Sequence, residues 1–165
     1  AQQRITARLE RLARHCSADV DELAPLLANF AGFICAELSA TAASPATDGC
    51  VHHSLRVWLE PTLPTGVPCE PILIRDGQDR EEVIFDIFLD SDGAEIKEQR
   101  HALACRPGTP SGSLHFSAIP GATSDCVVYW VNVFQNNRLI QILELTATTI
   151  EMENRNDSAW NQSFH

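Results

Sequence analysis

The sequence lacks the local signals by which membrane proteins, secreted proteins and several enzyme classes are recognised. No apolar run is long enough to cross a bilayer, and the chain does not open with the charged and apolar regions of a signal peptide. No two cysteines stand in Cys-x-x-Cys spacing, and no Gly-x-Ser-x-Gly motif is present, so the usual signatures of a zinc ribbon and an α/β-hydrolase are missing. We therefore expect a cytoplasmic protein without a membrane partner, cofactor or enzymatic activity.

Positive charge is scarce. Twelve basic residues face 22 acidic ones, which gives a formal net charge of −10, and such a charge opposes broad binding to nucleic acid or anionic lipid. We therefore expect protein partners, either a second copy of the chain or other domains of a longer parent protein. The six cysteines are expected to be mostly buried, reduced thiols, as in a reducing compartment.

The chain does contain enough apolar sequence for one core. Of its 165 residues, 44% are hydrophobic and 21% are charged, which is ordinary for a globular protein. We expect a single domain over residues 1–150, with a helical part at 1–40 and a β-sandwich at 51–150, followed by a polar tail or linker at 151–165. Because the first residue is Ala1, we expect the chain to be a segment of a longer protein.

Two helices are predicted in the first 40 residues. In the first, apolar side chains recur every three or four positions, and a basic stripe lies beside them. The second prediction rests on a wide apolar face between residues 23 and 38. The small and polar residues 39–50 predict a linker between helices and strands. The apolar stripe of the first helix contains Ile5, Leu9, Leu12 and Cys16, and its basic stripe contains Arg4, Arg8, Arg11 and His15.

Short strand candidates separated by turn residues fill the rest of the chain. No helical pattern interrupts them, which is typical of an antiparallel sandwich or barrel. The predicted fold class is α+β, with an N-terminal helical pair packed on an antiparallel β-sandwich of seven or eight strands. The candidate strands are residues 52–60, 70–75, 82–90, 94–104, 113–119, 126–135 and 138–149.

One hairpin is predicted from its asparagine-rich turn. Asn136 and Asn137 suit a type I′ turn because asparagine tolerates positive φ. One face of this hairpin is expected in the core and the other under the N-terminal helices. One cross-strand pair would join two amides, either as a device that fixes the register or as polar contacts of a ligand pocket. The predicted register places Phe134 opposite Leu139 and Asn132 opposite Gln141.

A second hairpin is predicted around a glycine turn. The strand at 83–89 is expected to turn through residues 91–93 and to return along 95–98. The returning segment is highly charged, as is typical of an exposed edge strand.

Four aspartates flank the 82–90 strand and could supply oxygen ligands to calcium. A ligand- or calcium-binding sandwich is therefore one alternative function, with Asp76 and Asp79 as metal ligands. Asp90 and Asp92 lie at the other end of the strand, roughly 25 Å away at about 3.3 Å per residue, so the four cannot bind one ion. The leading interpretation is that these aspartates are solvated turn residues.

A second alternative is a small metal-dependent hydrolase that uses scattered His and Cys side chains. His52 and His53 are neighbours on a strand, so their side chains point to opposite faces. His101 and Cys105 lie on one face about 13 Å apart. A zinc site would therefore need further ligands from elsewhere in the fold.

Residues 127–146 combine an aromatic and apolar strand, an asparagine-rich turn and an Arg-Leu-Ile-Gln run at 138–141. This segment resembles the final hairpin of β-sandwich accessory domains in bacterial multidomain defence and signalling proteins. Those domains accompany CHAT-peptidase, TIR, von Willebrand A-type or NTPase modules. The resemblance implies a non-catalytic module and supplies no active-site residues.

The function expected from the sequence is therefore a non-catalytic protein-interaction or regulatory module of a larger multidomain protein. The expectation rests on the absence of a coherent catalytic constellation together with the apolar helical face. Partner contact or self-association is expected through the helices. The basic stripe could meet an acidic partner surface or remain solvated, but contact with this chain's own acidic sheet or self-association is the favoured interpretation. The predicted interface residues are Arg4, Arg8, Arg11, Phe30, Phe33 and Trp160.

Overall fold

The computed structural model describes residues 2–16, 26–41, 50–122 and 125–148. These residues form one helix and nine strands, so β structure dominates the fold. The helix is α1 (Gln2–Cys16), and the strands are β1 (Phe30–Thr41), β2 (His52–Glu60), β3 (Cys69–Ile74), β4 (Val83–Asp92), β5 (Ala94–Ile96), β6 (Arg100–Cys105), β7 (Leu114–Pro120), β8 (Cys126–Gln135) and β9 (Arg138–Thr148).

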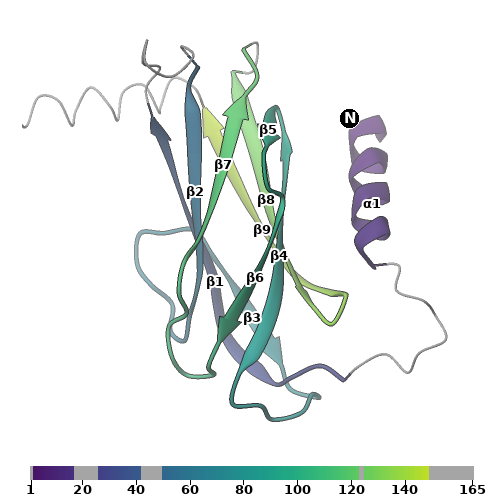
Figure 1. Ribbon diagram of the computed structural model, residues 1–165, viewed down its shortest axis with the longest axis vertical. Helices are drawn as coiled ribbons and strands as arrows, with labels where there is room; N and C mark the ends of the chain where they lie inside the picture. Colours follow the sequence, from purple (N-terminus) through teal and green to yellow (C-terminus); the bar gives the residue numbers. More distant parts are fainter. Residues whose placement is uncertain (1, 17–25, 42–49, 123–124, 149–165) are drawn as a thin grey trace, which may run out of the picture.

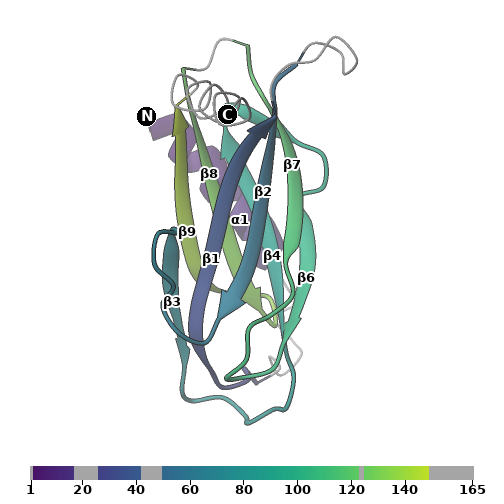
Figure 2. The same cartoon turned by 90° about the vertical axis from the view of Figure 1, so that its left-hand side faces the viewer.

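The strands form two antiparallel sheets that lie face to face in a sandwich-like arrangement (Figures 1 and 2). The first sheet has five strands in the order β3-β1-β2-β7-β5, and the second has four in the order β6-β4-β8-β9. Strands β3 and β5 are therefore the edges of the first sheet, and β6 and β9 are the edges of the second.

The core lies between the sheets and follows from the two-residue alternation of strands. Leu55 and Val57 of β2 and Val131 of β8 point inward and are at most 1% exposed. Phe30 of β1 and Phe85 of β4 meet edge to face, with ring centroids 5.0 Å apart. The inward-facing residues of both sheets thus form one contiguous apolar cluster.

Most predicted strands are confirmed, including those at 52–60 and 126–135. The candidate at 94–104 is instead two strands, β5 and β6, which lie in different sheets. The predicted asparagine turn is also confirmed, because Asn136 and Asn137 have φ values of 48° and 60°.

The predicted helical pair is wrong, because residues 30–41 form β1 between β2 and β3. Ile34 and Ala36 of β1 point into the core, while Cys35 on the opposite face is also fully buried. A strand that is covered on both faces carries a nearly continuous apolar run, and periodicity cannot tell such a run from a helix. The part of the prediction that falls on residues 17–25 lies outside the described residues.

The predicted boundary between helices and strands at residues 39–50 is wrong for the same reason. β1 and β2 pair directly, from Phe33 opposite Glu60 to Thr41 opposite His52. This stretch of the chain therefore connects two neighbouring strands of one sheet, and the predicted helical part at 1–40 reduces to α1. Residues 42–49, like the predicted tail at 151–165, lie outside the described residues.

The second predicted hairpin is not formed. β4 pairs with β6 and β8, whereas the segment directly after β4 becomes β5 and pairs with β7 in the other sheet. Gly93, with a φ of 98°, marks the change of sheet, and its carbonyl oxygen accepts a hydrogen bond from the backbone N of Gly121 at 2.8 Å. A charged segment suits an edge strand of either sheet, so its pattern did not specify which one.

The predicted register of the last hairpin is correct at Phe134 opposite Leu139 and wrong beyond this pair. A bulge in β9 inserts one extra residue, so that Asn132 lies opposite Ile142. A shift of one residue exchanges the faces of a strand, and the predicted amide pair is therefore not formed. Gln141 instead donates a hydrogen bond to the carbonyl oxygen of Pro71 in β3 at 2.8 Å.

Candidate functional site

Helix α1 lies against the outer face of the four-stranded sheet, away from the core (Figures 1 and 2). Its sequence contains no glycine or proline and is rich in arginine, leucine and alanine, which favours a helix. The opposing surface comes from alternate, outward-facing positions of β4 and β8. We call it the helix-binding face and define it by Phe88, Asp90, Trp130, Asn132 and Phe134.

The apolar part of this contact is small. Leu12 is 6% exposed and packs with Phe88 and Phe134 in a cluster that is separate from the main core. Among the described side chains of α1, Leu12 is the one that is fully covered. Burying a leucine contributes about 1.5–3 kcal/mol, so hydrophobic burial alone gives the helix only modest anchorage.

Arg8 of α1 binds the β8 side of the helix-binding face. Asn132 is completely buried; its Nδ2 donates to the carbonyl oxygen of Phe88 at 3.1 Å and to that of Trp130 at 3.2 Å, and its Oδ1 accepts from Arg8 at 3.4 Å. The Arg8 guanidinium also lies 4.5 Å from the centre of the Trp130 ring, in cation–π geometry. One residue of the helix therefore completes the hydrogen bonds of a buried amide and covers an indole.

Arg11, one turn further along α1, binds the β4 side. Its guanidinium lies 3.2 Å from Oδ2 of Asp90, a carboxylate whose side chain is 4% exposed, while the Arg11 side chain is 39% exposed. The other carboxylate oxygen of Asp90 accepts a hydrogen bond from the backbone N of Ser91 at 2.9 Å. Asp90 is therefore not the solvated turn residue that the sequence predicted, but the anionic partner of the helix.

The charge distribution favours this docking. Four of the twelve basic residues and one of the 22 acidic residues lie within α1, so the rest of the chain carries 8 basic and 21 acidic residues, a formal charge of −13. A basic helix thus lies on an acidic sandwich, and the attraction between them weakens with salt.

The helix docks with its basic side turned toward the sheet. Leu12 and Leu9 belong to the same predicted apolar stripe, yet Leu12 is buried and Leu9 is 59% exposed. Arg8 and Arg11 face the sheet because a carboxylate, an amide and an indole are available there. Helical periodicity located both stripes but could not indicate which one binds.

The other predicted interface residues have different surroundings. Phe30 is 5% exposed and belongs to the main core, and Phe33 is half-buried on the outer side of β1. The side chain of Arg4 and the whole of Trp160 lie outside the described residues. The two predicted interface arginines that the structure describes therefore contact this chain's own sheet.

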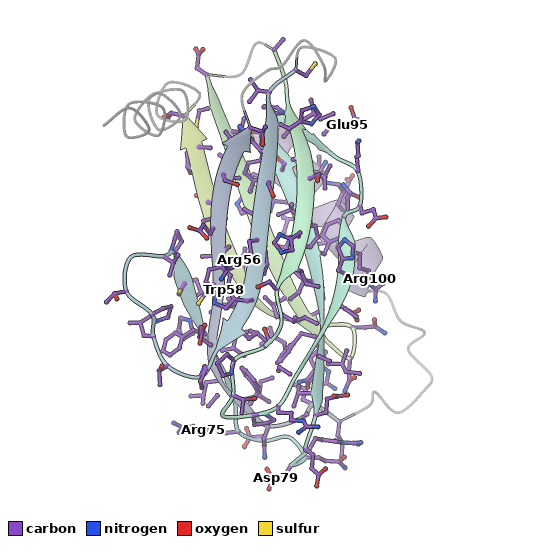
Figure 3. The ribbon with its side chains drawn as sticks, turned by 60° about the vertical axis from the view of Figure 1, so that its left-hand side comes forward. Arg56, Trp58, Arg75, Asp79, Glu95 and Arg100 are labelled. Carbon is purple, nitrogen blue, oxygen red and sulfur yellow. The ribbon has the colours of Figure 1, made fainter. Side chains whose placement is uncertain are left out.

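The two aspartates of the predicted calcium site, Asp76 and Asp79, differ in their surroundings. Asp79 accepts a hydrogen bond from Asn29 Nδ2 at 2.8 Å, and Asn29 Oδ1 accepts from the backbone N of Gly77 at 2.7 Å. These bonds join the loop after β3 to the start of β1, while Asp76 is exposed. Asp79 and the β4–β5 turn next to Glu95 lie at opposite ends of the molecule (Figure 3). Within the described ranges, no three His, Cys, Asp or Glu side chains are grouped to hold a metal ion.

The candidate zinc ligands are likewise engaged elsewhere. His101 Nε2 lies 3.3 Å from a carboxylate oxygen of Glu98, and the ring packs edge-on against Phe116. The Cys105 thiol donates to the carbonyl oxygen of Val83 at 3.6 Å. These contacts account for both residues in structural terms.

A buried histidine–tyrosine pair links the two sheets. His53 of β2 and Tyr129 of β8 share a hydrogen bond of 2.6 Å between Nδ1 and the phenolic oxygen. Burial lowers the pKa of His53 and raises the pKa of Tyr129, so both side chains are kept neutral. The sequence predicted that His52 and His53 point to opposite faces, and the burial of His53 agrees, but no sequence signal identified its partner.

Comparison with protein-family models, curated proteins and solved structures finds no match for this chain. Among the described residues, no helix is long and apolar enough to cross a membrane. The helix-binding face is the candidate site, and its assignment follows from the geometry of the contacts with α1.

Proposed function

We propose that this domain is a non-catalytic protein-interaction module whose helix-binding face is a receptor for basic amphipathic helices. In the single chain, α1 occupies that receptor. The observation that carries the proposal is the burial of Asp90 and Asn132, two polar side chains of the face that receive hydrogen bonds from arginines of α1. A sheet surface with no binding role would gain more stability from apolar residues at these positions.

The spacing of the helix contacts defines the class of ligand. Arg8 and Arg11 are three residues apart and Leu12 follows directly, so all three lie toward one side of a helix. Any helix with an Arg-x-x-Arg-Leu pattern can make the same contacts. We propose that such a helix belongs to another domain of the parent protein or to a second copy of this chain.

The contact with α1 is weak enough to be exchanged for a partner. A cation–π contact contributes about 0.5–1 kcal/mol, and an ion pair with one exposed partner contributes about 0–1 kcal/mol. Among the described residues, Nε of Arg8 is buried without a hydrogen-bond partner, which costs about 1–3 kcal/mol. A helix of this length is also marginal in isolation. A partner helix that hydrogen-bonds Asn132 and Asp90 without burying an unpaired guanidinium nitrogen would therefore displace α1.

The resemblance of residues 127–146 to accessory domains of bacterial defence and signalling proteins supports the same class of function. We propose accordingly that the chain works in the cytoplasm as one module of a larger assembly. Exchange of α1 for a partner helix would then report the state of a neighbouring domain.

A labelled peptide of residues 2–16, added to the full chain, tests the proposal. Leu12→Asp places a charge between Phe88 and Phe134, so the tethered helix should leave the face. The peptide should then bind this variant roughly tenfold more tightly than the wild type, a difference of about 1.4 kcal/mol, as measured by fluorescence anisotropy. Light scattering of the wild type would show whether the helix also joins two copies.

The matched control adds Asp90→Ala to the Leu12→Asp variant. This change removes the carboxylate that binds Arg11, so most of the gained affinity should be lost. A peptide carrying Arg11→Glu should bind the Leu12→Asp variant as poorly as the unchanged peptide binds the double variant. Equal peptide binding to the single and double variants would overturn the proposal.

A further inference from the structure

Two cysteines lie directly opposite each other at the edge of the five-stranded sheet. Cys35 of β1 pairs with Cys69 of the edge strand β3. The next pair is hydrogen-bonded, since the backbone N of Ala36 donates to the carbonyl oxygen of Pro68 at 3.1 Å. Because hydrogen-bonded and non-hydrogen-bonded pairs alternate, Cys35 and Cys69 occupy a non-hydrogen-bonded position, where Cα atoms are about 4.5 Å apart. That separation lies within the range of about 4.4–6.8 Å that a disulfide requires.

The two sulfur atoms already lie within reach of a bond. The Sγ atoms of Cys35 and Cys69 are 2.6 Å apart, within roughly half an ångström of the S–S bond length of about 2.05 Å. Neither side chain needs a change of strand register to reach the other. The sequence predicted mostly buried, reduced thiols; Cys35 is a buried free thiol and Cys69 a partly exposed one, and no sequence signal placed them opposite each other.

The two thiols differ in access. Cys35 is 0% exposed and lies opposite Trp58 of β2, whereas Cys69 is partly exposed. Burial raises the pKa of Cys35 well above that of an ordinary thiol, and the hydrogen bond and charge of Cys69 raise it further. A soluble reagent therefore meets Cys69 first, and Cys35 reacts second, from within the sheet.

The geometry points to Cys35 and Cys69 as a redox site that forms a reversible disulfide with low-molecular-weight disulfides such as oxidised glutathione. The Cys69 thiolate attacks one sulfur of the reagent and releases the first thiolate, which leaves a mixed disulfide on Cys69. Cys35 then loses its proton, its sulfur attacks the Cys69 sulfur, and the second reagent thiolate is released. The two protein thiols lose two electrons, the reagent gains them, and the two protons end on the released thiols.

The bond would fasten an edge strand to the sheet. In the five-stranded sheet, β3 is hydrogen-bonded to β1 alone, and it also accepts the hydrogen bond from Gln141 of β9. A Cys35–Cys69 disulfide closes a loop that contains the whole of β2. Because closing such a loop lowers the conformational entropy of the unfolded chain, the disulfide should raise the melting temperature by roughly 5–10 °C.

Peptide mapping of the full chain after treatment with oxidised glutathione tests the assignment. We expect a cross-linked peptide that joins Cys35 to Cys69, a loss of two hydrogen atoms from the intact mass, and reversal by dithiothreitol. Buried Cys105 serves as an internal control and should stay reduced. The background variant Cys50→Ser/Cys126→Ser removes two exposed thiols and should leave the cross-link unchanged.

Two variants separate the roles of the thiols. Cys35→Ala should stop the reaction at the mixed disulfide, so the chain gains the mass of one glutathione at Cys69. Cys69→Ser should leave Cys35 reduced. Trp58, which stacks under Arg56 at 4.2 Å on the same outer face (Figure 3), supplies a fluorescence signal that should change in the wild type and in neither variant. If Cys35 and Cys69 of the wild type are recovered uncross-linked while Cys50 or Cys126 is oxidised, the assignment is wrong.

Discussion

Two buried interfaces hold this molecule together, and their chemistry differs. Between the sheets, one contiguous cluster of apolar side chains excludes water, and Phe30 and Phe85 meet edge to face within it. Between α1 and the helix-binding face, a cluster of three apolar residues is bordered by guanidinium, carboxylate and amide groups. Apolar side chains carry no charge for salt to screen, whereas the Arg11–Asp90 pair has one partly exposed partner and is screened in part. We therefore expect the sandwich to keep its stability when the salt concentration changes, whereas docking of α1 depends on it.

The largest expected effect comes from opening a cavity in the main core. Phe85→Ala removes a ring that is 0% exposed, and such a change destabilises a domain by about 3–5 kcal/mol. Urea denaturation followed by circular dichroism measures the loss. The matched control is Ile84→Ala, whose side chain is 56% exposed on the other face of β4 and should change stability little. Equal losses in the two variants would contradict the assignment of the core.

The buried His53 should make the core sensitive to acid. Burial lowers the pKa of His53 in the folded chain, so below the ordinary histidine pKa of about 6.5 the unfolded chain binds a proton that the folded chain excludes. Stability is therefore fully present above this pKa and should fall as the pH drops from about 7 toward 5. The loss should be smaller than that of Phe85→Ala, because a single group titrates.

Urea titrations at both pH values, with a non-titrating variant, check this assignment. His53→Gln keeps a polar partner for Tyr129 and should show a weaker dependence on pH. His115→Gln, at an exposed position of β7, is the control and should retain the wild-type dependence. Identical pH profiles for the wild type and His53→Gln would show that His53 does not titrate as the buried pair requires.

The contrast between the interfaces also explains how far the sequence could be interpreted. Short runs of strand-forming residues between turn signals predicted β2 and β8 to the residue. The same argument failed for β1, because its consecutive residues Ile34, Cys35 and Ala36 are buried on both faces of the strand and such an apolar run also fits a helix. It also failed for the bulge in β9, since one inserted residue leaves the turn unchanged while it exchanges the faces of the strand.

The candidate site was only partly predictable. The basic stripe containing Arg8 and Arg11 was visible, and so was the possibility that it contacts the chain's own acidic sheet. Asp90 and Asn132 were assigned to a turn and to a cross-strand pair, because their role depends on a helix that lies about 80 to 120 residues away in the sequence. The sequence signal that could have identified both residues is a polar side chain at an outward position of an otherwise apolar strand.

Truncation of the apolar contact under the helix should have a smaller effect than the cavity in the core. Leu12→Ala is expected to cost about 1–2 kcal/mol, less than the 2–5 kcal/mol typical of leucine truncations in a core, because α1 can leave the sheet and let water fill the site. The loss should appear as reduced helical circular dichroism and a shift of Trp130 fluorescence, with little change in the unfolding of the sandwich. Leu9→Ala, on the exposed side of the same helix, should leave both signals unchanged.

The smallest expected effect is electrostatic, and it distinguishes the two interfaces most directly. Arg11→Gln removes the cation that lies 3.2 Å from Asp90, and it should weaken docking by at most about 1 kcal/mol because the Arg11 side chain is partly solvated. Raising the salt concentration from about 0.05 to about 1 M screens the same pair, so docking of α1 in the wild type should weaken as salt is added. In Arg11→Gln, where the pair is already absent, added salt should weaken docking only a little further. Arg56→Gln, which changes an arginine on the opposite sheet, should keep the wild-type response. A salt response unchanged by Arg11→Gln would mean that Asp90 and Arg11 do not govern docking, and the helix would then depend on Leu12 alone.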